Sequence, residues 1–276
     1  MSEKPQVGIV GYGYVGQAME KFFAGHAEVW VADVREFVHD HKVDIGHINE
    51  CCSVAFVCVP TPQSPDGQAD ISAVTEVVHQ LETPLIVLKS TVPPGTTDAL
   101  KRVTGKPLVF SPEYVGESAY FTPAPYDFHQ EVARTPWFTF GGSPEDTKVC
   151  VHLFTPIAGP VKRYIQTTAL EAELAKYMEN SFYATKIAFC HEMAGVCEAF
   201  GADYTEVREL WLADPRINPM HTAVWDKEGP PFSGKCLPKD IAGIVYAAKL
   251  AGYDPELLAE VIATNGRLDG RRKEER

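Results

Sequence analysis

A glycine-rich turn near the start of the chain constrains the fold more than any other feature. The apolar segment Val7–Val10 runs directly into Gly11-Tyr12-Gly13-Tyr14-Val15-Gly16, and a helical pattern of apolar residues follows. Glycines at the first, third and sixth positions, between a strand and a helix, are typical of a dinucleotide-binding turn. Gly11 would make the tight turn, Gly13 would let a pyrophosphate approach the backbone, and Gly16 would let helix and strand pack closely. We therefore predict an N-terminal Rossmann-type α/β domain whose cofactor contacts all six residues of the turn.

The next predicted strand, Glu28–Ala32, ends in Asp33. A carboxylate at this distance from the glycine turn accepts hydrogen bonds from the hydroxyls of the adenosine ribose. It would also repel a 2′-phosphate, so the sequence favours NAD over NADP, although the nearby Arg35 would weaken that repulsion. The alternative is that Asp33 is only a turn residue at the end of a strand.

Further apolar runs at Val54–Val59, Leu85–Leu88 and Leu108–Phe110 are each followed by a polar cluster. Strands that alternate with helical stretches predict a parallel, doubly wound sheet. Ligands bind such sheets outside the carboxyl ends of the strands, where these clusters fall. Four residues of the first two clusters are therefore predicted to contact the cofactor: Pro60, Thr61, Ser90 and Thr91.

The pattern changes after a predicted strand around Val161–Ile165. Thr168 can cap a long helix that continues to Phe200 and stops at Gly201, a length of roughly 45 Å. Shorter helices are predicted at Ile241–Ala251 and Pro255–Ala263. We expect a Rossmann domain over residues 1–166 and an all-helical domain over 167–276. So long and apolar a helix needs partners on several sides, which predicts a homodimer formed through it.

The stretch with the most chemically distinctive residues is Gly234-Lys235-Cys236-Leu237-Pro238-Lys239-Asp240. If a helix begins here, Pro238 suits its first turn, and Cys236 and Asp240 lie on one face. A thiol at a helix N-terminus beside two lysines is expected to have a lowered pKa. These features predict a covalent nucleophile; the alternative is a buried free thiol.

Composition limits the possible partners and compartments. The net charge of −12 argues against nucleic acid or an anionic membrane as the main partner. No apolar run approaches the ~20 residues that cross a bilayer, and the first residues lack a signal-peptide pattern. Seven cysteines without a Cys-x-x-Cys pair predict reduced thiols in the cytoplasm. The histidines and aspartates of His39–His47 match no metal-ligand spacing, so we predict an exposed polar loop and no metal.

Several motifs occur together and in order, and as a set they are highly specific. With these motifs the chain resembles the UDP-glucose/GDP-mannose dehydrogenase family over residues 7 to about 265. The motifs are Gly11–Gly16, Val59-Pro60-Thr61-Pro62, Lys89-Ser90-Thr91-Val92-Pro93, Ser111-Pro112-Glu113, Glu173-x-x-Lys176-x-x-x-Asn180, Asp214-x-Arg216-Ile217 and Gly234-x-Cys236-x-Pro238-Lys239-Asp240. Glu173 and Lys176 could alternatively form an ordinary surface ion pair, which is how most such spacings resolve.

The resemblance implies oxidation of the C6 hydroxyl of a nucleotide sugar to a carboxylate in two NAD-dependent steps, of the UDP-glucose to UDP-glucuronate type. Lys176 and Asn180 would stabilise the oxyanion at C6, and Asp240 with Thr91 would hold the water that takes the hydroxyl proton. Cys236 would form a thiohemiacetal and then a thioester. The resemblance also implies that Glu117 is the base for thioester hydrolysis. The implied substrate-binding residues are Glu113, Lys176, Asn180, Arg216 and Gly234, with Arg216 reaching the substrate across a dimer.

The sequence departs from the family pattern in three places. We expect no counterpart of the family's third, nucleotide-holding domain within these residues. Ser233 replaces the first glycine of the usual pair before the cysteine, and the segment Val224–Pro231 is longer and more polar than the family's glycine-rich equivalent. Two other functions stay open: a two-electron dehydrogenase of the β-hydroxyacid type, which needs no thiol, and a non-catalytic NAD-binding remnant that dimerises.

Overall fold

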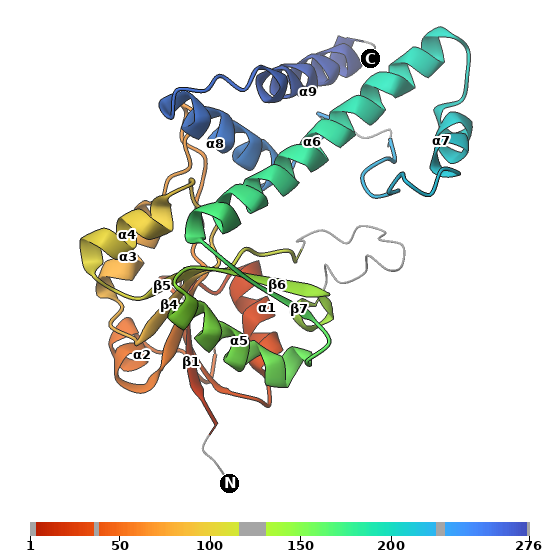
Figure 1. The fold of residues 1–276 in the computed structure, drawn as a ribbon. Coiled ribbons are helices and arrows are strands. Elements are labelled where there is room, and N and C mark those ends of the chain that lie inside the picture. Colours follow the sequence, from red (N-terminus) through yellow and green to blue (C-terminus); the bar gives the residue numbers. More distant parts are fainter. Residues whose placement is uncertain (1–3, 36–38, 116–130, 225–229, 275–276) are drawn as a thin grey trace. The chain divides into compact units, whose positions relative to one another are not determined.

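The computed structural model describes residues 4–35, 39–115, 131–224 and 230–274 (Figure 1). These residues form two compact units. The first comprises residues 1–62 and 70–176, and the second comprises residues 63–69 and 177–276. One helix, α6 (Ala169–Ala199), begins in the first unit and continues into the second.

The first unit is built on a seven-stranded sheet with the order β2-β1-β3-β4-β5-β6-β7. Neighbouring strands run parallel except β5 and β6, which are antiparallel. Because β1 lies between β2 and β3, the connections reverse direction beside β1, and a crevice opens at such a switch point. The strands are β1 (Gln6–Val10), β2 (Glu28–Ala32), β3 (Val54–Val57), β4 (Leu85–Leu88), β5 (Leu108–Phe110), β6 (Trp137–Gly141) and β7 (Arg163–Thr167).

The predicted Rossmann-type sheet is confirmed through its first five strands. The sequence analysis did not predict β6, which runs antiparallel to β5. The aromatic run Trp137-Phe-Thr-Phe suits a strand, but a strand's own residues do not encode its direction. Its direction depends on the connection that precedes it. The last strand begins at Arg163, two residues later than we predicted.

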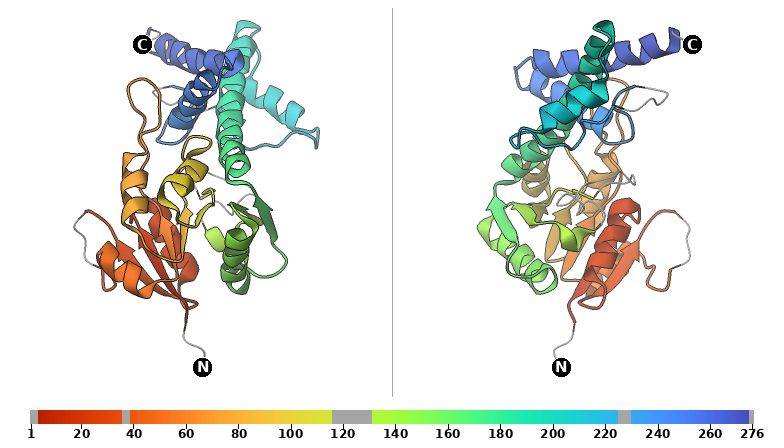
Figure 2. Two further views of the ribbon diagram at one scale, coloured as in Figure 1. Left: turned by 60° about the vertical axis from the view of Figure 1, so that its left-hand side comes forward. Right: turned by 90° about the vertical axis from the view of Figure 1, so that its right-hand side faces the viewer.

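Helices cover both faces of the sheet (Figures 1 and 2). On one face, Phe22 and Phe23 of α1 pack with Phe154 of α5 against the inward side chains of the strands. On the other face, α2, α3 and α4 contribute a second apolar cluster that includes Ile48 and Leu100. These helices are α1 (Tyr14–Phe23), α2 (Ile45–Cys51), α3 (Ser72–Gln80), α4 (Thr96–Thr104) and α5 (Pro144–Ala158).

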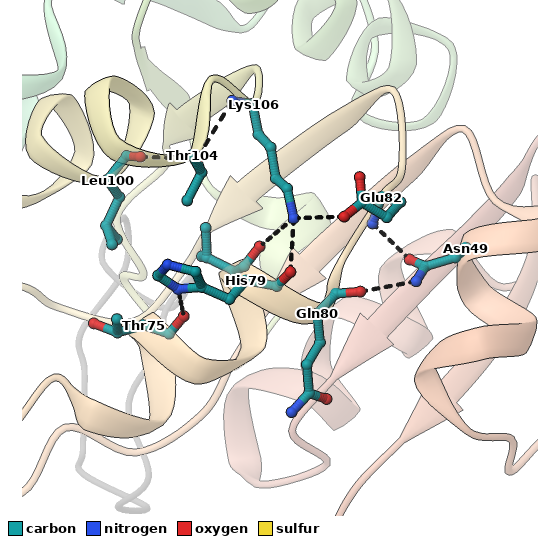
Figure 3. Close-up of polar contacts among 9 residues, drawn as sticks. Asn49, Thr75, His79, Gln80, Glu82, Leu100, Thr104 and Lys106 are labelled. Carbon is teal, nitrogen blue, oxygen red and sulfur yellow. Dashed lines mark hydrogen bonds and ion pairs between the residues drawn. The ribbon is translucent and has the colours of Figure 1, made fainter.

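A lysine fixes the end of α3 at the amino-terminal edge of the sheet (Figure 3). Lys106 Nζ donates to the carbonyls of Val78 at 3.1 Å and His79 at 2.7 Å, and it pairs with Glu82 at 2.9 Å. A cation stabilises the last carbonyls of a helix, which otherwise have no intrahelical partner. The cluster accounts for where α3 ends, and it lies away from the carboxyl edge.

The segment His39–His47 is only partly the polar loop that we predicted. Asp44 accepts a hydrogen bond from the His47 N–H at 2.8 Å and thereby caps α2, so Ile45–His47 form the first turn of a helix. His39 pairs with Glu20 at 2.8 Å. Among the described residues, no group of three or more His, Cys, Asp or Glu side chains is placed to hold a metal ion.

The described elements of the second unit are helices, as predicted. They are the greater part of α6 together with α7 (Tyr204–Leu212), α8 (Leu237–Leu250) and α9 (Glu256–Glu274), of which α9 is longer than expected. Their core joins Ala184 and Ala188 of α6 to Ile241 of α8 and Val261 of α9. The short arm at residues 63–69 belongs to this unit and approaches α8 through Gly67.

The long helix begins and ends as predicted. Thr168 Oγ1 accepts from the Glu171 N–H, and Glu171 accepts from the Thr168 N–H, which together form a capping box. At the other end, Gly201 adopts a φ of +69°. No helix in the described parts of the chain combines the length and apolarity needed to cross a bilayer.

Candidate active site

The three glycines of the first turn have different surroundings in the structure. Gly11 has a φ of +95°, and a Cβ there would come within 2.7 Å of the Cys58 backbone, just beyond β3. A Cβ on Gly16 would lie 2.1 Å from the Gly11 carbonyl oxygen, so only glycine permits this helix–strand approach. A Cβ on Gly13 would meet no atom within 4 Å, which leaves the backbone accessible to a ligand.

The N-terminus of α1 suits an anionic ligand. Gly13 is the N-cap, α1 has no acidic residue in its first turn, and within the described residues no side chain caps this end by a hydrogen bond. The backbone N–H groups and the helix dipole therefore favour a phosphate. The turn also lies at the switch point beside β1, where doubly wound sheets bind nucleotides. These residues fit the pyrophosphate of a dinucleotide.

Asp33 lies directly against the glycine turn. One of its carboxylate oxygens accepts from the Tyr12 N–H at 2.6 Å. The Arg35 guanidinium binds both carboxylate oxygens, at 2.9 and 2.8 Å, and holds the pKa of Asp33 well below its usual range. Asp33 also accepts from the Arg35 N–H at 2.8 Å, so it is a turn residue as well as a neighbour of the cofactor turn. A ribose hydroxyl would share this carboxylate with Arg35.

Two predicted cofactor residues tie neighbouring loops of the carboxyl edge together. Thr61 donates its hydroxyl to the Thr91 carbonyl at 2.8 Å, and Ser90 donates to the Val59 carbonyl at 2.6 Å. Both side chains are buried, whereas Pro60 is exposed. The loops after β3 and β4 are thus joined before any ligand binds.

A buried ion pair, which the sequence analysis did not find, orders the loop after β5. Lys89 donates to the Pro112 carbonyl at 3.1 Å and lies 3.5 Å from Glu113 Oε2. Glu113 Oε1 accepts from the N–H groups of Tyr114 at 2.7 Å and Val115 at 2.6 Å. The sequence signal that could have indicated this pair is Lys89 itself, a charged residue directly after the apolar strand Leu85–Leu88. The predicted base Glu117 lies outside the described residues. So do residues 225–229, which are part of the segment Val224–Pro231 that differs from the family pattern.

Glu173 is a structural anchor, so the alternative of a Glu173–Lys176 surface pair is wrong. Its carboxylate is fully buried. It accepts from the Gly95 N–H at 2.5 Å, the Thr97 N–H at 2.9 Å and the Thr97 hydroxyl at 2.6 Å. These donors form the N-terminus of α4, where a carboxylate is favoured. Burial nevertheless raises the pKa of Glu173.

Lys176 and Asn180 lie four residues apart on α6 and therefore share a face. Lys176 is buried with its ammonium 5.0 Å from the centre of the Tyr114 ring. Asn180 Nδ2 donates to Asp240 Oδ2 at 2.5 Å, and both side chains are buried. Asp240 also pairs with the neighbouring Lys239 at 2.5 Å. The structure thus brings together Asn180 of α6 and Asp240 of α8, which are 60 residues apart in sequence.

Cys236 is the N-cap of α8 and is exposed, so the alternative of a buried thiol is wrong. Pro238 lies in the first turn of that helix, as predicted, and the Asp240 N–H donates to the Cys236 carbonyl at 2.8 Å. By contrast, burial raises the pKa of Cys58 to about 12. Gly234 precedes the helix with a φ of +86°, which favours glycine.

Arg216 lies on the loop after α7. Its guanidinium pairs with Asp214 at 2.6 Å, and its side chain is 86% exposed. The predicted residues thus fall into two groups. The glycine turn, Asp33, the carboxyl-edge loops and Lys176 belong to the first unit, and the other described residues belong to the second.

The fold and the glycine turn define a dinucleotide-binding α/β protein with a helical second unit. Comparison with known proteins is more specific. Residues 40–124 match the NAD binding domain of the UDP-glucose/GDP-mannose dehydrogenase family, and residues 170–267 match the central domain of the same family. The chain therefore belongs to the UDP-glucose/GDP-mannose dehydrogenase family, and its cofactor is NAD.

Individual relatives agree with this assignment. A UDP-glucose 6-dehydrogenase of Pseudomonas aeruginosa is 33% identical over 232 residues, which are 78% of this chain and 48% of that protein. The Haloferax volcanii UDP-glucose 6-dehydrogenase is 29% identical over 94% of this chain and 69% of its own length. The chain spans about half the length of several curated relatives that it matches.

Solved structures support the fold. A UDP-glucose dehydrogenase from Pyrobaculum islandicum has a TM-score of 0.81 at 23% identity, over 96% of this chain and 69% of that one. A 3-hydroxyisobutyrate dehydrogenase from Mycobacterium tuberculosis has a TM-score of 0.69 at 16% identity, over 97% of this chain and 94% of that one. At these identities the likeness concerns the fold alone.

Proposed function

We propose that this protein oxidises the C6 hydroxyl of a nucleotide sugar to a carboxylate, with two NAD reduced for each sugar. The observation that carries the proposal is the start of α8. There an exposed thiol, Cys236, stands one helical turn before a buried carboxylate, Asp240, which Asn180 holds by a hydrogen bond. A two-electron alcohol oxidation has no use for the thiol, whereas a second oxidation can use it to capture the aldehyde as a covalent adduct.

In the first oxidation, C6 loses a hydride and its hydroxyl loses a proton, which leaves an aldehyde. NAD, when bound, accepts the hydride. Asp240 and Thr91 hold the water that receives the proton, and the Lys176 ammonium with the Asn180 amide stabilises the negative charge that develops on the oxygen. The hydrogen bond from Asn180 to Asp240 fixes the amide for this role.

In the second oxidation, the Cys236 thiolate forms a carbon–sulfur bond to the aldehyde carbon, and the resulting thiohemiacetal loses a hydride to a second NAD. The thioester that remains is cleaved by water, with Glu117 as the base, and the thiolate leaves. Four electrons have then moved from C6 to two NAD molecules. Glu113, Gly234 and Arg216 are proposed to bind the sugar nucleotide.

A substrate panel tests this proposal. UDP-glucose, GDP-mannose and related nucleotide sugars are each incubated with NAD, and NADH is counted by absorbance while the sugar acid is identified by mass spectrometry. We expect at least one substrate to yield two NADH per acid formed. The absence of turnover across the whole panel, with NAD binding intact, would count against the proposal.

A second candidate is a two-electron β-hydroxyacid dehydrogenase. The observation that favours it is the likeness in fold to the 3-hydroxyisobutyrate dehydrogenase, almost all of whose length this chain covers. Cys236→Ser separates the two candidates. A four-electron enzyme should lose the second NADH, whereas a two-electron enzyme should keep its activity, since its chemistry does not use the thiol.

We also propose that the protein forms a homodimer through α6. Several exposed apolar side chains of α6 and its end lie within about 40° of one another around the helix, at about 100° per residue. They are Met178, Phe182, Phe189, Val196 and Phe200. A row of this kind favours association with an apolar surface, and a two-fold axis would place the same row on both partners.

Light scattering after size-exclusion chromatography tests the dimer. Phe182→Asp places a charge in the middle of the row and should give a monomer. Leu250→Asp is the matched control, because Leu250 is also exposed but lies on α8, and it should leave the mass unchanged. A wild-type monomer would refute the dimer.

We further propose that the protein acts in the cytoplasm, where its thiols stay reduced.

A further inference from the structure

The ammonium of Lys176 lies over an aromatic ring. Its Nζ is 5.0 Å from the centre of the Tyr114 ring, within the ~6 Å at which a cation is attracted to the face of a ring. The side chain is buried, at 8% exposure. Burial of a cation disfavours its charged form and strengthens nearby electrostatic contacts. The ring is therefore close enough to affect the charged form of Lys176.

The position of the Tyr114 ring is fixed by contacts other than the one with Lys176. Glu113 accepts from the N–H groups of both Tyr114 and Val115, which sets the backbone on either side of the ring. The ring of Trp137, the first residue of β6, lies against Tyr114 at a centroid separation of 5.0 Å. Tyr114 is thus held by the loop that carries it and by a neighbouring strand.

Lys89 holds Glu113 in turn. It is 4% exposed, lies 3.5 Å from Glu113 Oε2 and donates to the carbonyl of Pro112. A buried ion pair of this kind is weak evidence for stability, and its best attested use is to specify one conformation. Here the conformation specified is that of the loop from Pro112 to Val115, which presents the ring.

The helix that carries Lys176 is fixed independently. Glu173, one turn earlier on α6, bonds to the N-terminus of α4 through Gly95 and Thr97. The cation and the ring both belong to the first unit, and a carboxylate holds the segment that carries each of them. This arrangement orients the ammonium before any substrate arrives.

We propose that Tyr114 is a positioning residue for Lys176: its ring orients the ammonium and favours its charged form. The inference rests on the proposed function, in which that ammonium stabilises the oxyanion at C6. It adds a residue that the family resemblance did not supply. The aromatic face carries the effect, so Phe at this position should serve as well as Tyr, and an aliphatic side chain should not.

Competitive labelling of amines tests the contact without any substrate. The whole protein is trace-acetylated over a range of alkaline pH, and peptide mass spectrometry follows the labelling of Lys176, with the exposed Lys148 of α5 as the internal standard. Loss of a cation–π contact should move the midpoint for Lys176 down by about 0.5 to 1 pH unit in Tyr114→Leu and in Tyr114→Met, whose side chain is longer and more flexible. Tyr114→Phe should match the wild type.

Kinetics then connect the contact to the reaction. On a substrate that turns over, Tyr114→Leu should move the alkaline limb of kcat to lower pH while KM changes less than twofold. An unchanged Lys176 midpoint in both Tyr114→Leu and Tyr114→Met would overturn the proposal, whatever the activity. A shifted midpoint in a protein that oxidises no nucleotide sugar would instead uphold the contact and refute the proposed function. The two failures are therefore distinguishable.

Discussion

Removal of the Glu173 carboxylate should destabilise the first unit severely. In Glu173→Ala, three donors at the N-terminus of α4 lose their acceptor: two backbone N–H groups and the Thr97 hydroxyl. A buried donor without a partner costs about 1 to 3 kcal/mol. Since water can reach some of them once the side chain is gone, we expect a total of about 3 to 5 kcal/mol. For a unit of this size that lowers Tm by roughly 10 °C.

Glu171 is the matched control for this experiment. It lies in the same turn of α6, but it is exposed and serves a capping box, so Glu171→Ala should cost only about 0.5 to 1 kcal/mol. Differential scanning calorimetry gives both changes in Tm, and amide hydrogen exchange at the start of α4 localises the effect. If Glu173→Ala lowers Tm no more than Glu171→Ala does, the anchoring role is refuted.

Glu173 should make the protein less stable as the pH rises above 4.5. Because burial raises its pKa above the ordinary 4.5, the folded state binds the proton more tightly than the unfolded chain does. Its contribution to stability is therefore fully present below pH 4.5 and is lost as the pH rises through the raised pKa. Glu173→Gln should not show this loss, so the free energy of unfolding of the wild type minus that of the variant should fall as the pH rises above 4.5 in a series of thermal melts.

Three further predictions concern the thiol, a strained histidine and the cofactor. Iodoacetamide should modify Cys236 roughly 3- to 30-fold faster than Cys51, because both thiols are exposed but one lies at the N-terminus of a helix and the other at the C-terminal end; equal rates would remove the argument for activation. His221 has a φ of +62° and a pKa that burial lowers to about 4, so stability should fall by up to about 3 kcal/mol as the pH decreases from about 6.5 to about 4. His221→Asn, which tolerates this φ, should abolish that fall in a series of thermal melts. Asp33→Ser should weaken NAD binding at least tenfold and improve NADP binding, since Arg35 would then face the 2′-phosphate; calorimetry that finds NAD affinity unchanged would contradict the role of Asp33.

The parts of the fold that sequence predicts well are those set by local pattern. Apolar runs placed the first five strands closely, and Thr168 and Gly201 marked both ends of the long helix. The strand β6 with its direction and the partner of Glu173 were not predicted, since the direction and the partner depend on contacts between distant segments. A Glu-x-x-Lys spacing is the same whether the carboxylate faces water or a helix N-terminus.

The candidate site shows the same division. The tight turn at Gly11 and the close packing at Gly16 followed from the glycine spacing, and the start of α8 followed from Pro238. The Lys89–Glu113 pair and the ring beneath Lys176 could not be predicted in this way. Each joins segments that are distant in sequence and that only the folded chain makes neighbours.

The central claim is that the sulfur of Cys236 captures the sugar as a covalent intermediate. The measurement that tests it most directly is peptide mass spectrometry after an acid quench of a single turnover, with the nucleotide sugar that the panel identifies and with NAD. The account predicts that the peptide containing Cys236 gains the mass of the sugar nucleotide as a thioester, and that this mass disappears as the second NADH and the acid accumulate. If the acid and two NADH form while Cys236 stays unmodified at every time, or form equally in Cys236→Ser, the claim is contradicted.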